Sequence, residues 1–472
     1  MTFRSGFLLL LAALLVFPAM ARCEERTDQP LPSPITLEGA VDYALAHQPI
    51  LRAQGAEDEA ADANLSIARA QLIPRGDIGV QENRATGNVV PGSHFSMAGI
   101  PPISGPPSGR VFDSGVWGST AGLSAWWDIA HLTQQMTLVD AALAVRAGSR
   151  AAHDAAELSV AFAGADAFAI AVEAHQEVEA ARASLERARV LRTNVGAFVR
   201  SGLRPGADEA RAQAEVALAE TQLARAEQAE SVSLAQLARA LGAAGQPITI
   251  EAGKLREAPP SEQAAEIVSA RNPFLVGADA ETRAARAREH AEFLEYIPRV
   301  EIAGALFGRG NGLFPGGANL GFAQGVVPDT PNWAAGVIVT IPIFQYPEIH
   351  SRVDLAAAQS KLSLARRDEV AQDVQSQIDS ARAILNGAYK VAHSTRVSVD
   401  SSSAALSQAS ARYKAGLYTI DAVAEALRLL AQAQADDAVA QVEIWRAKLL
   451  LARAVGDIGP LLAEISEASG GH

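Results

Sequence analysis

Residue types that could perform catalysis or bind a metal are scattered along this 472-residue chain. The nine histidines include no H-E-x-x-H pair, and none has a cysteine partner with metal-site spacing. No G-x-S-x-G nucleophile motif, phosphate-binding loop or dinucleotide fingerprint occurs in a suitable context. We therefore predict no enzymatic activity, no cofactor and no metal site, and we expect surface positions for the histidines in helices or at their edges: His47, His131, His153, His175 and His290.

The charge of the chain argues against a nucleic-acid partner. Its formal net charge is −13, and no cluster of Lys and Arg forms a basic patch. The acidic residues are spread over helix faces, where a carboxylate is usually solvated.

The N-terminus has the pattern of an export signal. Residues 1–21 combine Arg4, an apolar stretch over 7–17 and a small-x-small end at Ala19 and Ala21. Cys23 follows and has two interpretations: a lipid-modified N-terminus, which normally needs a small residue where Arg22 stands, or a single unpaired thiol. Because no later run approaches ~20 apolar residues, no transmembrane helix is expected.

Two segments read as very long helices. Residues 134–200 contain no proline and would extend roughly 100 Å as one helix, at ~1.5 Å per residue. Residues 351–415 form a second copy. Apolar positions in this copy alternate at steps of four and three, which is typical of helices packed side by side over a distance: Val374, Ile378, Ala381, Leu385, Ala388 and Ala392.

Short alternating segments predict strands before each long helix. Residues 75–86 and 120–129 alternate with a period of two, and the second has one apolar and one largely polar face. The segments 88–115 and 308–332, rich in Gly and Pro, are expected to be surface loops that lie outside the cell and tolerate insertion, for example at Gly105.

The chain contains an internal repeat. The IPR sequence at residues 73–75 recurs at 297–299, an offset of 298 − 74 = 224, and Gly202 corresponds to Gly416 at 416 − 202 = 214. Each half reads helix, strand, loop, strand, very long helix, turn and helix, with Asp208 as a possible N-cap of the first return helix. The predicted units are a signal peptide (1–21), a first repeat (22–242), a join (243–260), a second repeat (261–456) and a short polar tail (457–472).

Four strands in one chain are too few to close a membrane barrel, since the smallest membrane barrels have about eight. Open sheet edges are not viable in lipid. If the strands lie in a membrane, several copies must share one barrel, and a homotrimer would supply twelve strands.

This layout resembles the TolC-like outer-membrane efflux family over essentially the whole mature chain. The resemblance rests on the duplicated order of elements, on the entries into strands at Pro74 and Pro298, and on two sequences, GVIVTIPIF at 336–344 and RYKAGL at 412–417. It implies a mainly α fold with a small β part: long hairpins build a periplasmic α-barrel, and four strands per chain enter a trimeric twelve-stranded β-barrel in the outer membrane. It further implies a passive channel that contacts a periplasmic adaptor and an inner-membrane transporter.

The resemblance also implies a gate at the periplasmic aperture. Tyr413 matches a position that hydrogen-bonds to an acid on the neighbouring hairpin, and Asp208 matches that acid. Tyr418 stands where some members have an arginine, so any closing contact here is expected to be hydrogen-bonded rather than ionic. The alternative is that Asp208 is a helix cap and Tyr413 a packing residue.

Acidic residues near the same turn match the lining of the closed aperture. Glu425 matches one acid of the family, whereas the second would fall at Ala422, beside Asp421. The alternative interpretation of both acids is that they are solvated helix residues. The two turns, at Gly202, Leu203, Gly416 and Leu417, are the expected docking points for the adaptor.

A rival interpretation is a periplasmic coiled-coil adaptor or scaffold with no membrane span. Long Ala-rich hairpins suit that class of protein. However, it leaves the duplicated strand pairs and the Trp126–Trp127 pair without a role.

Overall fold

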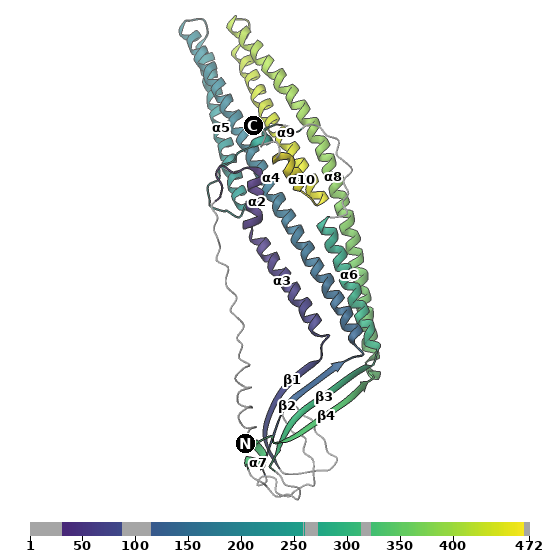
Figure 1. Cartoon of the computed structure of the whole chain (residues 1–472). Coiled ribbons are helices and arrows are strands. Elements are labelled where there is room, and N and C mark those ends of the chain that lie inside the picture. Colours follow the sequence, from purple (N-terminus) through teal and green to yellow (C-terminus); the bar gives the residue numbers. More distant parts are fainter. Residues whose placement is uncertain (1–30, 87–114, 258, 260–271, 313–321, 467–472) are drawn as a thin grey trace.

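The computed structural model describes residues 31–86, 115–257, 259, 272–312 and 322–466. The predicted signal peptide, Cys23 and Gly105 lie outside these residues, as does most of the first loop. The described chain is mostly helical, with one small sheet at one end of a long helical body (Figure 1).

The elements follow the predicted duplicated order. The first copy comprises α2 (Leu37–His47), α3 (Pro49–Ala70), β1 (Arg75–Thr86), β2 (Gly115–Asp128), α4 (Leu132–Arg200) and α5 (Gly206–Ala240). The second comprises α6 (Pro273–Phe293), β3 (Arg299–Asn311), β4 (Thr330–Thr340), α8 (Tyr346–Lys414) and α9 (Ile420–Val455). Short elements complete the described chain: η1 (Gly253–Arg256), η3 (Leu294–Tyr296), α7 (Phe322–Val326), η4 (Ile343–Gln345) and α10 (Gly459–Ser466).

Local sequence signals explain several element boundaries. The Thr36 hydroxyl accepts a hydrogen bond from the backbone N–H of Gly39 (3.2 Å) and so caps α2. Pro49 and Pro347 occupy first-turn positions, where the missing N–H removes no helical bond. Helix α8 therefore begins five residues earlier than predicted.

The four strands form one antiparallel sheet in the order β1-β2-β3-β4. Directly opposed residues point to the same face, and one such row consists of Ile78, Leu123, Leu306 and Trp333, each at least half exposed. A row on the opposite face is polar: Gln81, Thr120, Arg309 and Thr330. The sheet therefore presents an apolar row that stays exposed, while α7 covers the end of the same face at Trp117.

The second loop is shorter than predicted. Strand β3 continues to Asn311, and α7 lies within the segment that was expected to be loop. The Phe322 ring contacts the Trp117 ring edge to face at 5.1 Å, so α7 packs against the end of β2.

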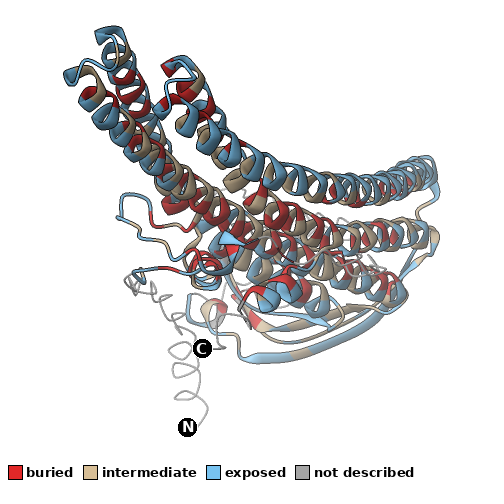
Figure 2. Ribbon diagram, turned by 90° about the horizontal axis from the view of Figure 1, so that it is seen from above, coloured by how far each residue is buried: buried red, intermediate tan, exposed pale blue. Residues whose placement is uncertain are grey.

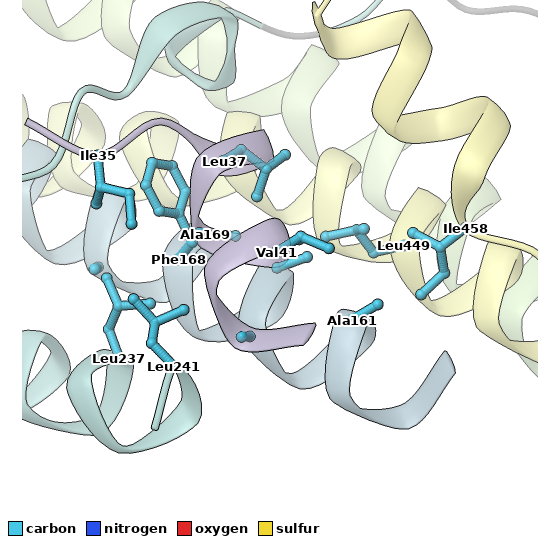
Figure 3. Packing of buried hydrophobic residues seen from close by; sticks show 14 of the residues in the cluster. Ile35, Leu37, Val41, Ala161, Phe168, Ala169, Leu237, Leu241, Leu449 and Ile458 are labelled. Atoms are coloured by element: carbon cyan, nitrogen blue, oxygen red, sulfur yellow. The ribbon is translucent and has the colours of Figure 1, made fainter. Parts of the chain in front are cut away.

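The main core lies where both copies meet around α2 (Figure 3). Phe168 of α4 is fully buried there, in one cluster with Val41 of α2 and Leu237 of α5. Leu449 of α9 belongs to the same cluster. Figure 2 shows buried residues concentrated between the helices, whereas the strands are mostly intermediate or exposed and long stretches of the outer helices are exposed. This core joins the two copies at mid-length and leaves the hairpin ends free of it.

Helix α9 has two apolar faces. Val442, Trp445 and Leu449 pack into the core around α2 and α4. Ile444 and Leu451 pack against α8, on the predicted seam that contains Val374, Ile378, Ala381 and Leu385. Helix α9 therefore connects the two long helices over much of its length.

One further prediction was wrong. The segment after residue 456, expected to be a polar tail, contains α10, and Ile458, Leu461 and Ile465 enter the main core because its apolar residues recur at helical spacing. Helix α4 contains a stretch long and apolar enough to cross a membrane. However, 56% of that stretch is buried within the protein, as expected for a core helix.

Candidate functional site

The two long hairpins end in similar turns at the same end of the molecule, far from the sheet (Figure 1). Gly202 and Gly416 adopt φ values of 73° and 80°, a left-handed conformation that favours glycine. The next residues close both turns in the same way: Leu203 N–H donates to Phe198 O and Leu417 N–H to Arg412 O, both at 2.9 Å. The Leu203 and Leu417 side chains are exposed. The turn geometry was thus predicted, while docking at these residues stays a proposal.

Just inside the turns, Tyr413 of α8 reaches across to the first hairpin. Its hydroxyl donates a hydrogen bond to Asp208 Oδ2 at 2.9 Å, and the side chain is only 3% exposed. Burial, together with the Asp208 carboxylate, raises the pKa of Tyr413 to about 12. Tyr413 is therefore a neutral donor at physiological pH.

Asp208 does not cap its helix. Helix α5 begins at Gly206 with Pro205 in the cap position, so Asp208 lies in the first turn. A carboxylate there is favoured by the helix dipole while its oxygens remain available to Tyr413. The alternative interpretation of Asp208 as an N-cap is therefore wrong.

Arg204 completes this contact and was missed in the sequence. Its Nη2 donates to the backbone oxygen of Tyr413 at 2.5 Å, and its guanidinium lies 4.4 Å from the centre of the Tyr413 ring. Its position two residues after Gly202 was an available signal, because a side chain there lies at the hairpin end. We call Asp208, Arg204 and Tyr413 the tyrosine latch.

A second contact between the hairpins lies about two helical turns from the tyrosine latch. Glu215 of α5 is 5% exposed and accepts hydrogen bonds from Arg428 of α9, at 3.2 Å from Nε and 2.5 Å from Nη2. Arg211 Nε lies 3.6 Å from the same carboxylate. Sequence reasoning missed this ion-pair latch, Glu215 with Arg428. The contact expected to be hydrogen-bonded rather than ionic is the one between Tyr413 and Asp208, and it is a hydrogen bond. The ionic contact of Glu215 with Arg428 joins the hairpins in addition and was not predicted.

The two acids predicted to line the aperture lie on the exposed side of α9. Asp421 is 72% exposed and lies 3.4 Å from Arg211, while Glu425 is 78% exposed and lies 3.7 Å from Arg428. Both acids therefore border the ion-pair latch. Tyr418 stays apart from it, since its hydroxyl accepts a hydrogen bond from Arg412 at 2.6 Å within its own hairpin.

Several predicted surface histidines are instead part of polar contacts. His131 is buried and lies 3.2 Å from Asp128, because it sits at the junction of β2 and α4. His153 contacts Asp58 at 2.7 Å and is partly buried between α3 and α4. Within the described residues, no group of three His, Cys, Asp or Glu side chains could hold a metal ion.

A charged cluster lies between α4 and α9 at mid-length. Arg446 of α9 donates to Asp166 of α4 at 2.8 Å and also bonds Glu443. Glu173 of α4 lies 3.9 Å from the same guanidinium. Burial raises the pKa of Glu173 to about 7, with Arg446 opposing and Glu443 reinforcing the shift.

Replacing Glu173 with glutamine should raise the thermal midpoint at pH 8 and leave it nearly unchanged near pH 4.5. The pKa is raised from 4.5 to about 7, so the folded state favours the protonated carboxyl. That contribution is complete below the unfolded pKa and is lost as the pH rises through 7. After allowance for solvent screening, Glu173→Gln should increase the free energy of unfolding at pH 8 by about 1 kcal/mol. Circular-dichroism melts of the parent, Glu173→Gln and a control at an exposed position of α4, Glu179→Gln, would measure it. Equal gains of Glu173→Gln at both pH values would contradict it.

The sequence matches the family described as outer membrane efflux protein over residues 40–243 and 265–457, and the chain belongs to this family. A comparison with curated proteins found no significant match.

Solved structures share the fold. CusC superposes with a TM-score of 0.76 at 14% identity, covering 93% of this chain and 98% of CusC. The outer membrane protein VceC from Vibrio cholerae gives 0.73 at 18% identity, covering 89% and 96%. The open state of the Neisseria gonorrhoeae channel MtrE gives 0.72 at 20% identity, covering 89% of both chains. The mainly α, two-repeat fold predicted from sequence is thus confirmed.

Proposed function

We propose that three copies of this chain form a passive outer-membrane channel that exports substrate from a periplasmic adaptor and an inner-membrane transporter. The observation that carries the proposal is the apolar row Ile78, Leu123, Leu306 and Trp333 across a sheet whose edge strands, β1 and β4, each have one side unpaired within the described chain. An exposed apolar face of this kind is stable in contact with lipid. The backbone groups of an unpaired edge strand are not, because lipid offers them no hydrogen-bond partner. Three sheets joined edge to edge would pair every strand in a twelve-stranded barrel.

The long helices support the same assembly. Exposed apolar residues follow α8 along its length: Leu355, Leu362, Ile384, Val391 and Val397. Neighbouring copies would bury them and form a tube of helices below the barrel. In this arrangement the body of helices lies in the periplasm, and the sheet end lies in the outer membrane.

Fractionation and mass measurement test this assembly. We expect the protein in outer-membrane fractions and, in mild detergent, light scattering at three times the mass of one mature chain. A stable folded monomer would contradict the trimer. A folded protein confined to the soluble periplasmic fraction would instead favour the rival adaptor or scaffold.

The acids bordering the ion-pair latch are proposed to line the aperture. In a trimer, three copies each of Asp421 and Glu425 would concentrate negative charge near one axis, which attracts cations. Replacing both with alanine should lower the cation-to-anion permeability ratio several-fold and weaken block by multivalent cations. Reversal potentials in planar bilayers would measure the ratio. The matched control is the double variant Glu186→Ala with Glu179→Ala on α4. Equal cation-to-anion permeability ratios for the two double variants would show that Asp421 and Glu425 are ordinary solvated residues.

The adaptor is proposed to dock at the two turns. Leu203 and Leu417 are exposed apolar side chains at the tips, each fixed by a glycine of positive φ. Replacing both leucines with aspartate should abolish export while trimers remain in the membrane, because an apolar contact would be exchanged for charge. Whole-cell efflux of a dye, with trimer content measured in parallel, tests this. Unchanged efflux would place the docking site elsewhere.

A further inference from the structure

A cavity of about 370 Å³ lies beside the tyrosine latch, between the two hairpins. Helix α4 forms one wall, α8 forms the other and α9 lies between them. Its lining is mostly apolar and includes Leu191, Phe198, Leu406, Val423 and Leu427. The cavity is within the size range of pockets that bind small molecules, about 300–1,000 Å³.

One cation in this wall has no carboxylate partner. Arg187 of α4 donates from Nη2 to Gln434 Oε1 at 2.6 Å, whereas its Nε is buried and has no partner among the described residues. Arg446 on α9, also partly buried, instead bonds the Asp166 carboxylate. A desolvated guanidinium with an unused donor is costly, and an anion brought into the cavity would satisfy it.

The remaining charges of the cavity also favour an anionic ligand. Lys414 of α8 adds a second cation to the lining. Glu186 also borders the cavity, but it is exposed and paired with Arg189 at 2.9 Å. The cavity therefore offers a ligand a mostly apolar lining whose charged side chains carry a net positive charge.

We propose that this cavity binds a small amphipathic anion, an aryl or alkyl carboxylate or sulfonate. The apolar part of the ligand packs against Leu191, Phe198 and Leu406, and its acidic group accepts from Arg187. The binding site depends only on the packing of α4, α8 and α9. The proposal of anion binding is therefore independent of whether the chain conducts solutes.

Two dyes with the same aromatic body test the charge requirement. The purified full-length protein is titrated with 8-anilinonaphthalene-1-sulfonate and with uncharged N-phenyl-1-naphthylamine. In Arg187→Gln, the affinity for the sulfonate should fall roughly ten- to hundredfold, the loss expected for a charge-assisted hydrogen bond, while that for the neutral dye stays unchanged. The control Arg192→Gln removes the same charge from an exposed position of α4 and should bind both dyes like the parent. Equal sulfonate binding by Arg187→Gln and Arg192→Gln would overturn the proposal.

Thiol protection tests the location. In a Cys23→Ser background, Ser410→Cys places a thiol in the cavity lining, and Ser407→Cys places one on the exposed side of α8. The sulfonate dye should slow alkylation at position 410 at least fivefold and leave position 407 unaffected. Equal rates with and without dye at position 410 would overturn the proposal. Protection at position 410 by a periplasmic adaptor but not by the dye would also overturn it, and would make the cavity a protein-docking groove.

Discussion

Replacing Arg428 with alanine should open the channel at its hairpin ends. Glu215 is almost fully buried and takes two hydrogen bonds from Arg428, so the variant leaves a buried carboxylate without its main partner. Removing one member of a buried ion pair costs several kcal/mol. We expect a loss of about 1–2 kcal/mol per chain, below the cost for a fully buried pair, because Arg428 is 42% exposed and Arg211 remains 3.6 Å from the carboxylate. Cells with this variant should admit a large hydrophilic antibiotic that the parent excludes.

Two controls separate the latch from general destabilisation. Arg189→Ala removes an exposed ion pair within the first hairpin and should leave cells as resistant as the parent. Glu215→Leu with Arg428→Met removes both charges and should restore much of the closure, since apolar groups can replace a buried pair without a stability loss. Equal antibiotic sensitivity of Arg428→Ala and Arg189→Ala would show that the ion-pair latch does not hold the hairpins.

Removing the Tyr413 hydroxyl should weaken the second latch. Tyr413→Phe keeps the ring that packs on Arg204 and Phe198 but removes the donor to Asp208. A hydrogen bond to a charged acceptor contributes about 1.5–3 kcal/mol, so channel openings should become roughly ten- to hundredfold more frequent. The added change Asp208→Ala should raise the opening frequency little further, because both variants break the same bond.

The pH dependence of opening provides a second measure of the same bond. The folded state raises the pKa of Tyr413 from 10 to about 12, so the closed contact is complete below pH 10 and is lost as the pH rises through 12. Single-channel records of the parent should show more openings over this window, and Tyr413→Phe should abolish the rise. The matched control is Tyr418→Phe, which changes an exposed tyrosine bonded to Arg412 and should keep the rise. A parent-like rise in Tyr413→Phe would exclude Tyr413 as the titrating group.

Local patterns were sufficient to predict most elements of the fold. The strand predicted over residues 75–86 is β1, and the seam at Val374, Ile378, Ala381 and Leu385 is buried as its spacing indicated. Apolar periodicity and helix-breaking residues are local signals that extend over a few residues. They can therefore be recognised in a single sequence. Helix α7 was missed because five residues carry no periodicity, and α10 was missed because eight residues are too few to establish a helical period.

The candidate site was predicted only where the family resemblance reached it. Tyr413 and Asp208 were named together, and the structure brings them into contact. Glu215 and Arg428 are 213 residues apart, and their contact depends on how the two hairpins rotate against each other. Nothing in the local sequence distinguishes Glu215 from the solvated acids around it. Its place seven residues after Asp208, on the same face of α5, becomes informative only once that face is known to meet α9.

Single-channel conductance of the purified protein in planar bilayers tests the central claim most directly. The claim is that three chains form one channel held closed by the tyrosine latch and the ion-pair latch. We predict small, infrequent current steps for the parent and larger, long-lived steps of one size for the triple variant Tyr413→Phe, Asp208→Ala and Arg428→Ala. Triple-variant trimers that insert into the bilayer but conduct no better than the parent would contradict the account.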